Sequence, residues 1–575
     1  MLKLYKYLKK YTAHIIAIVV LVFIQVMANL YLPTLMSDIV DKGLVNKDMN
    51  YIWKTGGYML LISGAGAICS VIASLFSAKT AVGLGTIIRE KLFTKVESFS
   101  LHEFDKIGTA TLITRTTNDV NQVQQVTVML LNMMIMAPLT CIGGVVMALG
   151  EDKKLTWIFA IVIPFISIVL ALVLRKALPL FKLMQVKLDK LNLVLRENLT
   201  GIRVIRAFNR IETEKVRFDA ANSDLMNNAV SVNIIMAVLM PLMMLVLNVT
   251  SVAVVWFGGI RIDNGGMQVG SLMAFIQYAM QILFSFLMLT MMFVLVPRAQ
   301  ASAVRINEVL DTEAEIVDIE DYKTAKNEKG YVEFKDVSFS YAGAEQPAIN
   351  NISFSARPGE TTAIIGGTGS GKSTLVNLIP RFYEAQQGTV LVDGVDVKEM
   401  TQEELRSKIG FVPQKNVLFS GTIAENIRYG NKNASLEEIK HAANISQATD
   451  FISGMDEGYD HYIAQGGTNV SGGQKQRLSI ARALVRKPEI YVFDDSFSAL
   501  DFKTDAKLRA ALKNETKDAT VIIIAQRVST VMDADRIIVL DEGKVAGIGT
   551  HSELMKNCSV YHEIVASQLS EEELA

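Results

Sequence analysis

Residues 360–379, ETTAIIGGTGSGKSTLVNLI, decide the fold of the second half of this 575-residue chain. The stretch begins as a short apolar strand, passes through a glycine-rich loop and ends in a helical pattern. Its loop matches GxxxxGK[ST], in which glycines let backbone N–H groups surround phosphates while the next helix N-terminus favours anions. We therefore expect an α/β nucleotide-binding fold around this loop.

The phosphate-binding motif assigns roles to individual residues. Lys372 is expected to pair with the β- and γ-phosphates, and the Ser373 hydroxyl to ligate Mg²⁺. The predicted nucleotide contacts in this loop are Gly366, Gly367, Thr368, Gly369, Ser370, Gly371, Lys372, Ser373 and Thr374.

Two further motifs follow the phosphate loop. Residues 490–493, IYVF, predict a strand that ends in Asp494-Asp495, and an acid at that place is expected to hold the Mg²⁺ shell, a role we assign to Asp494. Between the two strands, VSGGQ begins a helix and predicts a second anion site from Ser471, Gly472, Gly473 and Gln474. Because the chain's own loop already serves one nucleotide, this second site is expected to serve a nucleotide from elsewhere.

Charge is distributed unevenly along the chain. Residues 1–300 contain 28 Lys and Arg against 17 Asp and Glu, whereas residues 301–575 contain 29 against 41. Such an asymmetry indicates two units in different environments. Composition excludes a disordered or collagen-like chain, and three cysteines (Cys69, Cys141, Cys558) provide neither a disulfide framework nor a zinc motif.

The first half contains six intervals without charged residues, each long enough for a helix to cross about 30 Å of hydrocarbon. These intervals are residues 11–37, 55–78, 120–150, 155–174, 225–260 and 264–297. They predict an α-helical membrane domain with six transmembrane helices, fused to the α/β nucleotide-binding domain. We expect the membrane domain at residues 1–300, a linker at 301–330 and the nucleotide-binding domain at 331–575.

The basic start, MLKLYKYLKKY, predicts a helix lying on the cytoplasmic leaflet, and this sets the topology. The outer loops then carry 3, 2 and 1 Lys or Arg, whereas the N-terminus and inner loops carry 4, 6 and 11. This distribution follows the positive-inside rule. We expect a multi-pass protein in contact with the lipid of the cytoplasmic membrane, with both termini and the nucleotide-binding domain in the cytoplasm. The long inner loops are expected to be helical, with tips near 101–106 and 207–214.

VSGGQ beside these two nucleotide motifs resembles the signature of ATP-binding cassette (ABC) ATPases. The six preceding spans look like an exporter-type half-transporter, so the resemblance covers essentially the whole chain. It implies ATP and Mg²⁺ as cofactors, adenine stacking by Tyr341, approach of Gln414 to Mg²⁺ and a nucleotide contact from Asp501. The family pairs two cassettes head to tail, so this chain is expected to dimerise with a second half-transporter.

Two positions depart from the family pattern. Asp495 occupies the place of the glutamate that serves as general base, and Gln526 that of a histidine beside the γ-phosphate. Aspartate is one methylene shorter, and a misplacement of about 1 Å can cost ~100-fold in rate. Glutamine can donate a hydrogen bond but cannot titrate. These changes predict a site kept for binding but poor at hydrolysis, in a heterodimer whose partner is competent; a homodimer is the other possibility.

The sequence says less about the transported molecule. Spans five and six carry uncharged polar residues and many methionines: Asn248, Gln277, Gln281, Met236, Met240, Met243, Met244, Met280, Met288, Met291 and Met292. Such side chains suit an adaptable pocket for hydrophobic or amphipathic drugs, lipids or peptides, and equally suit ordinary helix packing. The lack of charge within the spans argues against an inorganic ion or a strongly charged substrate.

The prediction is therefore a transport ATPase that exports amphipathic small molecules. An ATP-gated channel or a regulatory membrane subunit on the same frame is the alternative. Six spans exclude a soluble repair or translation ATPase of cassette type, and no nucleic-acid partner is expected.

Overall fold

The computed structural model describes residues 1–319, 321–324 and 329–568. Residues 320 and 325–328 of the expected linker, and 569–575 of the expected nucleotide-binding domain, lie outside the described residues. The chain divides into two compact units. The helical unit comprises Met1–Glu97 and Gly108–Thr312, and the α/β unit comprises Ser98–Ile107 and Glu313–Ala575.

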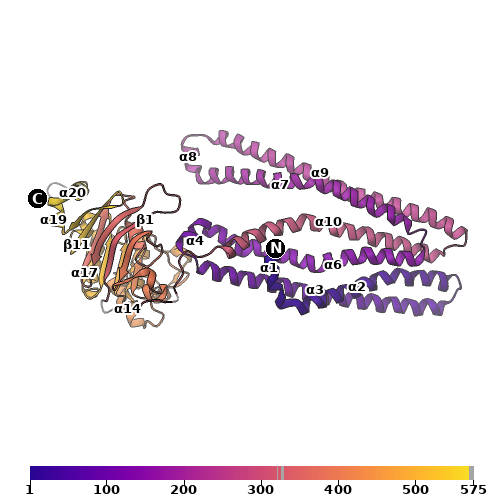
Figure 1. Cartoon of the computed structure of the whole chain (residues 1–575), viewed down its shortest axis with the longest axis horizontal. Coiled ribbons are helices and arrows are strands. Elements are labelled where there is room, and N and C mark those ends of the chain that lie inside the picture. Colours follow the sequence, from indigo (N-terminus) through magenta and orange to yellow (C-terminus); the bar gives the residue numbers. More distant parts are fainter. Residues whose placement is uncertain (320, 325–328, 569–575) are drawn as a thin grey trace. The chain divides into compact units, whose positions relative to one another are not determined.

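The helical unit consists of long helices joined by short turns (Figure 1). Its α-helices are α1 (Leu2–Tyr5), α2 (Thr12–Asp38), α3 (Met49–Glu97), α5 (Thr109–Thr114), α6 (Val120–Glu151), α7 (Trp157–Thr200), α8 (Ile202–Ala207), α9 (Ile211–Asp263) and α10 (Val269–Asp311). Six continuous helical segments within the described residues are long and apolar enough to cross a membrane, which confirms the predicted number. Helices suit this environment because every backbone group is satisfied within its own segment.

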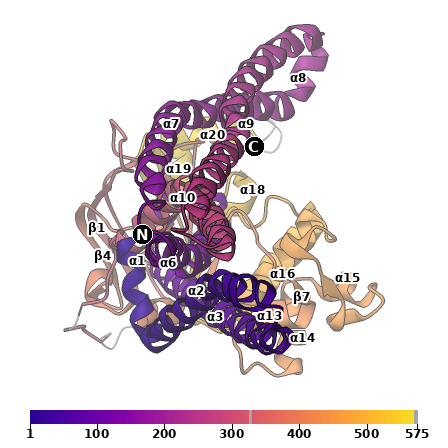
Figure 2. The same ribbon diagram turned by 90° about the vertical axis from the view of Figure 1, so that its right-hand side faces the viewer.

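The long helices pack mainly in neighbouring pairs: α2 with α3, α7 with α9, and α6 with α10 (Figures 1 and 2). Within its most apolar stretch, α10 has 40% of its residues buried, the largest share among the six segments. It is therefore the inner element of the helical unit, whereas the apolar side chains exposed on the other helices are suited to contact lipid.

Two short helices lie at the tips of the expected inner loops. The first, α4 (Leu101–Ile107), coincides with the expected tip at 101–106 and belongs to the α/β unit. The second, α8, ends at Ala207, where the expected tip at 207–214 begins, because α9 starts at Ile211 and takes most of that stretch. Likewise, α10 continues to Asp311, so the first part of the expected linker is helical.

The α/β unit is built on a six-stranded mixed sheet in the order β12-β11-β3-β10-β9-β6. The strands are β3 (Thr361–Gly366), β6 (Ile409–Val412), β9 (Ile490–Asp494), β10 (Thr520–Ile524), β11 (Arg536–Asp541) and β12 (Lys544–Gly549). Only β12 runs antiparallel to its neighbour. Side chains alternate across the sheet, so Ile365 packs into one hydrophobic core and Ile364 into a second.

A second, four-stranded antiparallel sheet has the order β2-β1-β4-β5. Its strands are β1 (Val332–Phe339), β2 (Ile349–Ala356), β4 (Gln387–Val392) and β5 (Val395–Asp396). The alternating pattern of residues 331–341 suggests an edge strand, and this expectation is wrong: β1 lies between β2 and β4. Alternation reports that one face of the sheet is buried, which is equally true of an inner antiparallel strand.

The remaining elements of the α/β unit are mostly helices. They are α11 (Lys372–Asn377), α12 (Gln402–Ser407), α13 (Ile423–Arg428), α14 (Leu436–Ile445), α15 (Thr449–Ser453), α16 (Gly472–Leu484), α17 (Phe502–Glu515), α18 (Val528–Val531), α19 (His551–Asn557) and α20 (Ser559–Ala566), with a short pairing of β7 (Gly421–Thr422) and β8 (Tyr462–Ile463).

A buried carboxylate connects the two sheets. Asp393, which follows β4, accepts hydrogen bonds from the backbone N–H groups of Gly330 (2.6 Å) and Tyr331 (3.1 Å) through one oxygen. Its other oxygen pairs with Lys408 Nζ at 2.6 Å, just before β6. Lys408 also pairs with Glu489, which directly precedes β9. The side chain of Asp393 is fully buried, so these partners replace the water it would otherwise bind.

We expect Asp393→Ala to destabilise the α/β unit by about 3 kcal/mol. Removing one member of a buried ion pair leaves the Lys408 ammonium group and the two backbone N–H groups without a partner. The midpoint of thermal unfolding, followed on the purified full chain, measures this loss. Glu399→Ala, which removes the exposed Lys323–Glu399 pair, is the matched control and is expected to change stability by less than about 1 kcal/mol. Equal midpoints for the two variants would contradict the structural role of Asp393.

Candidate functional site

The predicted nucleotide residues are brought together by the register of three parallel strands. Ile524, the last residue of β10, pairs with Ile364 of β3 on one side and with Asp494 of β9 on the other. The carboxyl ends of the strands therefore meet at one edge of the sheet, where ligands of open α/β sheets usually bind. The phosphate loop, the two aspartates and Gln526 all follow at this edge.

The loop between β3 and α11 requires glycine at particular places. Gly371 has φ +93°, a left-handed conformation that favours glycine, and a Cβ there would lie 2.6 Å from the carbonyl oxygen of Ala348. At Gly366 a Cβ would lie 2.1 Å from the carbonyl oxygen of Leu540. These close contacts explain why the tight turn into α11 requires glycine at both positions.

Lys372 is folded back over the loop that precedes it. Its Nζ donates hydrogen bonds to the carbonyl oxygens of Gly366 (2.9 Å) and Gly367 (2.7 Å). Burial lowers the pKa of Lys372, an effect that the nearby carboxylates of Asp495 and Asp494 partly oppose. The ammonium group is thus held at the loop, next to the place where a phosphate would be surrounded by backbone N–H groups.

Ser373 and Asp494 form a pair of oxygen donors. The Ser373 hydroxyl donates a hydrogen bond to Asp494 Oδ1 at 3.0 Å. Asp494 is buried, which raises the pKa of its carboxyl group, and its hydrogen bond with Ser373 partly offsets this effect. A hydroxyl and a carboxylate are the hard oxygen ligands that Mg²⁺ prefers, so the donor set fits this ion.

Asp495 is held by two amide side chains. Gln414 Nε2 donates to Asp495 Oδ2 at 3.3 Å, and Gln526 Nε2 donates to the same oxygen at 3.1 Å. The structure therefore brings together the three residues that the sequence assigns to the hydrolytic side of the site. Burial raises the pKa of Asp495, while the hydrogen bond from Gln414 works in the opposite direction. The backbone of Asp495 has φ +48°, which aspartate adopts more readily than most residues.

Tyr341 lies beside the same loop. Its hydroxyl forms a hydrogen bond with the Thr374 hydroxyl at 3.0 Å, and the residue is 41% exposed, so it is accessible to a ligand. The ring stands edge-on to Tyr383, with centroids 5.5 Å apart. An exposed aromatic ring anchored beside a phosphate loop suits the stacking of a base.

The VSGGQ segment forms the start of α16. Ser471 Oγ accepts a hydrogen bond from the Gln474 backbone N–H at 3.3 Å, while Gln474 Oε1 accepts one from the Ser471 backbone N–H at 2.8 Å. These reciprocal bonds form a capping box. Gly472 is exposed and a Cβ there would meet nothing within 4 Å, so the helix terminus is accessible. No interaction between these four residues and the phosphate loop occurs in the described part of the α/β unit.

Two further polar residues lie close to the signature and to Asp495 in sequence: Gln476 within α16, and Asp501 at the start of α17. Asp501 caps α17 by accepting the Thr504 N–H at 2.9 Å and is exposed, and those backbone hydrogen bonds lower its pKa. Sequence reasoning missed Gln476, whose buried side chain donates to the Asp495 carbonyl (3.3 Å) and accepts from the Ala499 N–H (3.2 Å). Its position two residues after the VSGGQ signature is the sequence signal that could have identified it. It ties α16 to the backbone of Asp495.

The helix α4 is anchored within the α/β unit. Buried Glu103 accepts hydrogen bonds from the backbone N–H and hydroxyl of Ser100, both at 2.6 Å, and from the Glu315 N–H at 3.1 Å. Tyr383 donates to Asp105 at 3.3 Å. The same Tyr383 ring contacts Tyr341, so a chain of direct contacts leads from the candidate base-stacking residue to α4.

Family profiles of known proteins match both the helical unit and the α/β unit of this chain. The family profile described as ABC transporter transmembrane region matches residues 15–286, and the profile described as ABC transporter matches residues 349–498. The first covers the spanning helices as far as the first part of α10, and the second covers the phosphate loop, the signature and both aspartates.

Relatives and solved structures extend the match to nearly the whole length. An uncharacterised ABC transporter ATP-binding protein of Mycobacterium tuberculosis is 43% identical over 98% of this chain and 97% of its own. The ATP-dependent lipid A-core flippase of Chromobacterium violaceum is 32% identical over 93% and 92%. A structure of a bacterial Atm1-family ABC exporter with ATP bound aligns at a TM-score of 0.81, with 25% identity over 97% of this chain and 98% of that chain.

These matches confirm the predicted fold class and the transport ATPase activity. The cassette of this family binds ATP, and its exporters work as dimers of half-transporters. With six candidate spans in the described residues, the protein is a multi-pass membrane protein. The chain belongs to the ABC transporter family and is an ATP-driven exporter of that family.

Proposed function

We propose that this chain is one half of a heterodimeric exporter that moves hydrophobic or amphipathic molecules across the cytoplasmic membrane, and that its own phosphate loop binds ATP but hydrolyses it poorly. The observation that carries the proposal is the environment of Asp495, whose Oδ2 accepts hydrogen bonds from both Gln414 and Gln526. The lipid A-core flippase among the relatives supports an amphipathic substrate.

ATP binding would exchange the internal contacts of the site for contacts to phosphate. Lys372 would leave the Gly366 and Gly367 carbonyls and pair with the β- and γ-phosphates. A hydrogen bond from an ammonium group to a charged phosphate is stronger than one to a neutral carbonyl. Ser373 and Asp494, with Gln414 nearby, would hold Mg²⁺, which supplies neutralisation of phosphate charge. Tyr341 would stack on the adenine.

Hydrolysis needs a base that reaches the attacking water. The Asp495 carboxylate is one methylene shorter than glutamate, and its Oδ2 already accepts hydrogen bonds from two amide donors, which occupy that oxygen in place of a water molecule. Gln526 can donate a hydrogen bond toward the γ-phosphate but cannot carry positive charge. Both properties favour retention of ATP over its hydrolysis.

The signature segment would act on the partner's nucleotide. Gly472 and Gly473 at the accessible start of α16 offer backbone N–H groups to an anion, and Gln476 connects this helix to the backbone of Asp495. The intact signature would therefore complete the competent site of the partner. Movement of the cassettes would be passed on through Tyr383 and Asp105 to α4. Both termini and the cassette would face the cytoplasm.

Lys372→Ala is expected to weaken ATP binding to the full chain by about 10- to 100-fold, because a charge-assisted contact is worth about 1.5–3 kcal/mol. Equilibrium binding of a fluorescent ATP analogue measures the change. Lys432→Ala, at an exposed lysine elsewhere in the α/β unit, is the control and should bind as the unaltered chain does. Unchanged binding by the Lys372 variant would place the nucleotide elsewhere.

The chain purified alone is expected to hydrolyse ATP slowly, and its complex with a second half-transporter to hydrolyse it rapidly. Turnover of the chain, of the partner and of their complex, each measured in nanodiscs, tests this. Robust turnover by a homodimer of this chain would overturn the heterodimer proposal. ATP-dependent uphill accumulation in vesicles distinguishes export from a channel, since a channel only dissipates a gradient.

Asp495→Glu combined with Gln526→His is expected to raise hydrolysis by this chain about tenfold or more, because the carboxylate gains a methylene and the second position gains a titratable donor. Steady-state release of phosphate measures the gain. The matched control is Asp495→Asn with Gln526→His, which keeps the histidine but lacks a base. No difference between the two double variants would show that the geometry around the site, and not the two side chains, limits turnover.

A further inference from the structure

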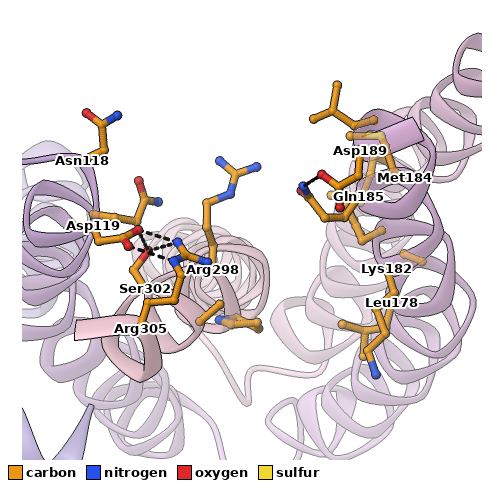
Figure 3. A pocket seen from close by; sticks show the side chains of 17 residues that line it. Asn118, Asp119, Leu178, Lys182, Met184, Gln185, Asp189, Arg298, Ser302 and Arg305 are labelled. Atoms are coloured by element: carbon orange, nitrogen blue, oxygen red, sulfur yellow. Dashed lines mark hydrogen bonds and ion pairs between the residues drawn. The ribbon is translucent and has the colours of Figure 1, made fainter. Parts of the chain in front are cut away.

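The helical unit contains a cavity of about 850 Å³ that the nucleotide chemistry does not use, within the 300–1,000 Å³ range of small-molecule sites (Figure 3). It lies between α7 on one side and α10, with the start of α6, on the other, and Met236 of α9 also lines it. All of these residues belong to the helical unit.

The charged residues of the cavity stand where the apolar spans end. Arg298 directly follows the uncharged interval 264–297, on the side from which the chain continues into the α/β unit. Lys182 follows the interval 155–174 by two turns of α7, and Asp119 directly precedes the interval 120–150. The cavity therefore combines an apolar zone with a charged rim.

One acid and one base of the rim satisfy each other. Asp119 is buried and accepts hydrogen bonds from Ser302 Oγ and Arg305 Nε, both at 2.8 Å, and it forms an ion pair with the Arg305 Nη2 atom. Figure 3 shows this network on the α10 side of the cavity. The charge of Arg305 is therefore neutralised by Asp119 within the protein.

The charged groups of two rim residues, Arg298 and Lys182, have no partner among the described residues. Neither side chain forms an ion pair or a hydrogen bond there. They lie on opposite walls, Arg298 near Ser302 and Lys182 near Leu178 (Figure 3). The remaining acid, Asp189, accepts a hydrogen bond from Gln185 at 3.0 Å and pairs with neither cation.

The rest of the lining is mainly apolar and comes from α7, α9 and α10. The large side chains among them are Leu178, Phe181, Met184 and Leu188 of α7 and Met236 of α9. Methionine and leucine walls adapt to flexible chains without specific geometry. An occupant with an apolar tail along these walls and a negative group between the two free cations would satisfy both parts of the cavity.

We propose that the cavity binds a single-tailed amphiphile with an anionic headgroup, a carboxylate or a phosphate monoester, held by Arg298 and Lys182. The guanidinium group presents a planar fork that matches either anion, and the ammonium group adds a second positive charge. The inference rests on the proposed export function and names its substrate class. It also refines the expectation drawn from the uncharged spans, because the recognition charges lie just beyond them.

The test is equilibrium binding, without nucleotide, to the native complex of this chain and its partner in nanodiscs of zwitterionic lipid. Four probes share one tail length and differ in headgroup: oleate, oleoyl lysophosphatidate, oleyl alcohol and oleylamine. Empty nanodiscs provide the blank. The variants are Arg298→Gln and Lys182→Gln, and the matched control is Lys190→Gln, an exposed lysine of α7 outside the cavity lining.

We expect at least one anionic probe to bind about tenfold or more tightly than oleyl alcohol, since a charge-assisted contact is worth about that factor or more. Arg298→Gln and Lys182→Gln should each remove most of this preference for the anionic probe. Binding of oleyl alcohol should stay unchanged, which shows that the variants are folded. Lys190→Gln should retain the preference for the anionic probe. A preference for oleate alone or lysophosphatidate alone supports the proposal and identifies the headgroup.

Equal affinity for the anionic probes and oleyl alcohol would overturn the proposal. Tightest binding of oleylamine would also overturn it, because Asp189 would then be the recognition group. Loss of anion preference in Lys190→Gln to the same extent would also overturn it. ATP turnover and uphill transport by the same complex separate this failure from failure of the proposed function. A complex that turns over ATP but lacks the anion preference refutes only the substrate class.

Discussion

The parallel pairing of β3, β10 and β9 is the constraint on which the nucleotide site depends. Ile524 is in register with both Ile364 and Asp494, so three connections leave the sheet at the same level. The phosphate loop, the acid pair and Gln526 are far apart in sequence, and only this register places them together. A shift of one residue in any strand would also exchange its side chains between the two cores, because successive side chains face opposite sides.

Much of this arrangement is predictable from sequence because each motif carries its own local geometry. GxxxxGK[ST] requires a strand, a turn and a helix, and Gly371 is indeed left-handed. Six uncharged intervals predict six spanning helices because hydrocarbon tolerates little else. Long-range partners are not predictable in this way. The placement of Tyr383 against Asp105, 278 residues apart, and of β1 inside its sheet depends on tertiary packing that no local pattern encodes.

The charged groups of the helical unit illustrate the same limit. Asp119 and Arg305 are separated by 186 residues and pair only because α10 packs along α6. From the sequence alone, Arg305 and Arg298 are equivalent basic residues near the end of a span. The structure separates them: both line the same cavity, but Arg305 pairs with a buried carboxylate, whereas the Arg298 side chain has no ionic partner among the described residues. Function can be assigned to a charge only after its protein partners are known.

A related argument applies to the nucleotide site, where several of the polar groups predicted to contact ligand already have protein partners. Lys372 is bonded to two carbonyls, Ser373 to Asp494, and Asp495 to two amides. Nucleotide binding at these groups therefore exchanges hydrogen bonds, and an exchange between neutral partners contributes only about 0.5–1.5 kcal/mol each. The larger gain arises where a charge replaces a neutral acceptor, at Lys372. In the proposed function, the Asp495 carboxylate receives both amides while remaining one methylene short, so the exchange that favours binding would do little for hydrolysis. Affinity and turnover would then be governed by different residues of one site.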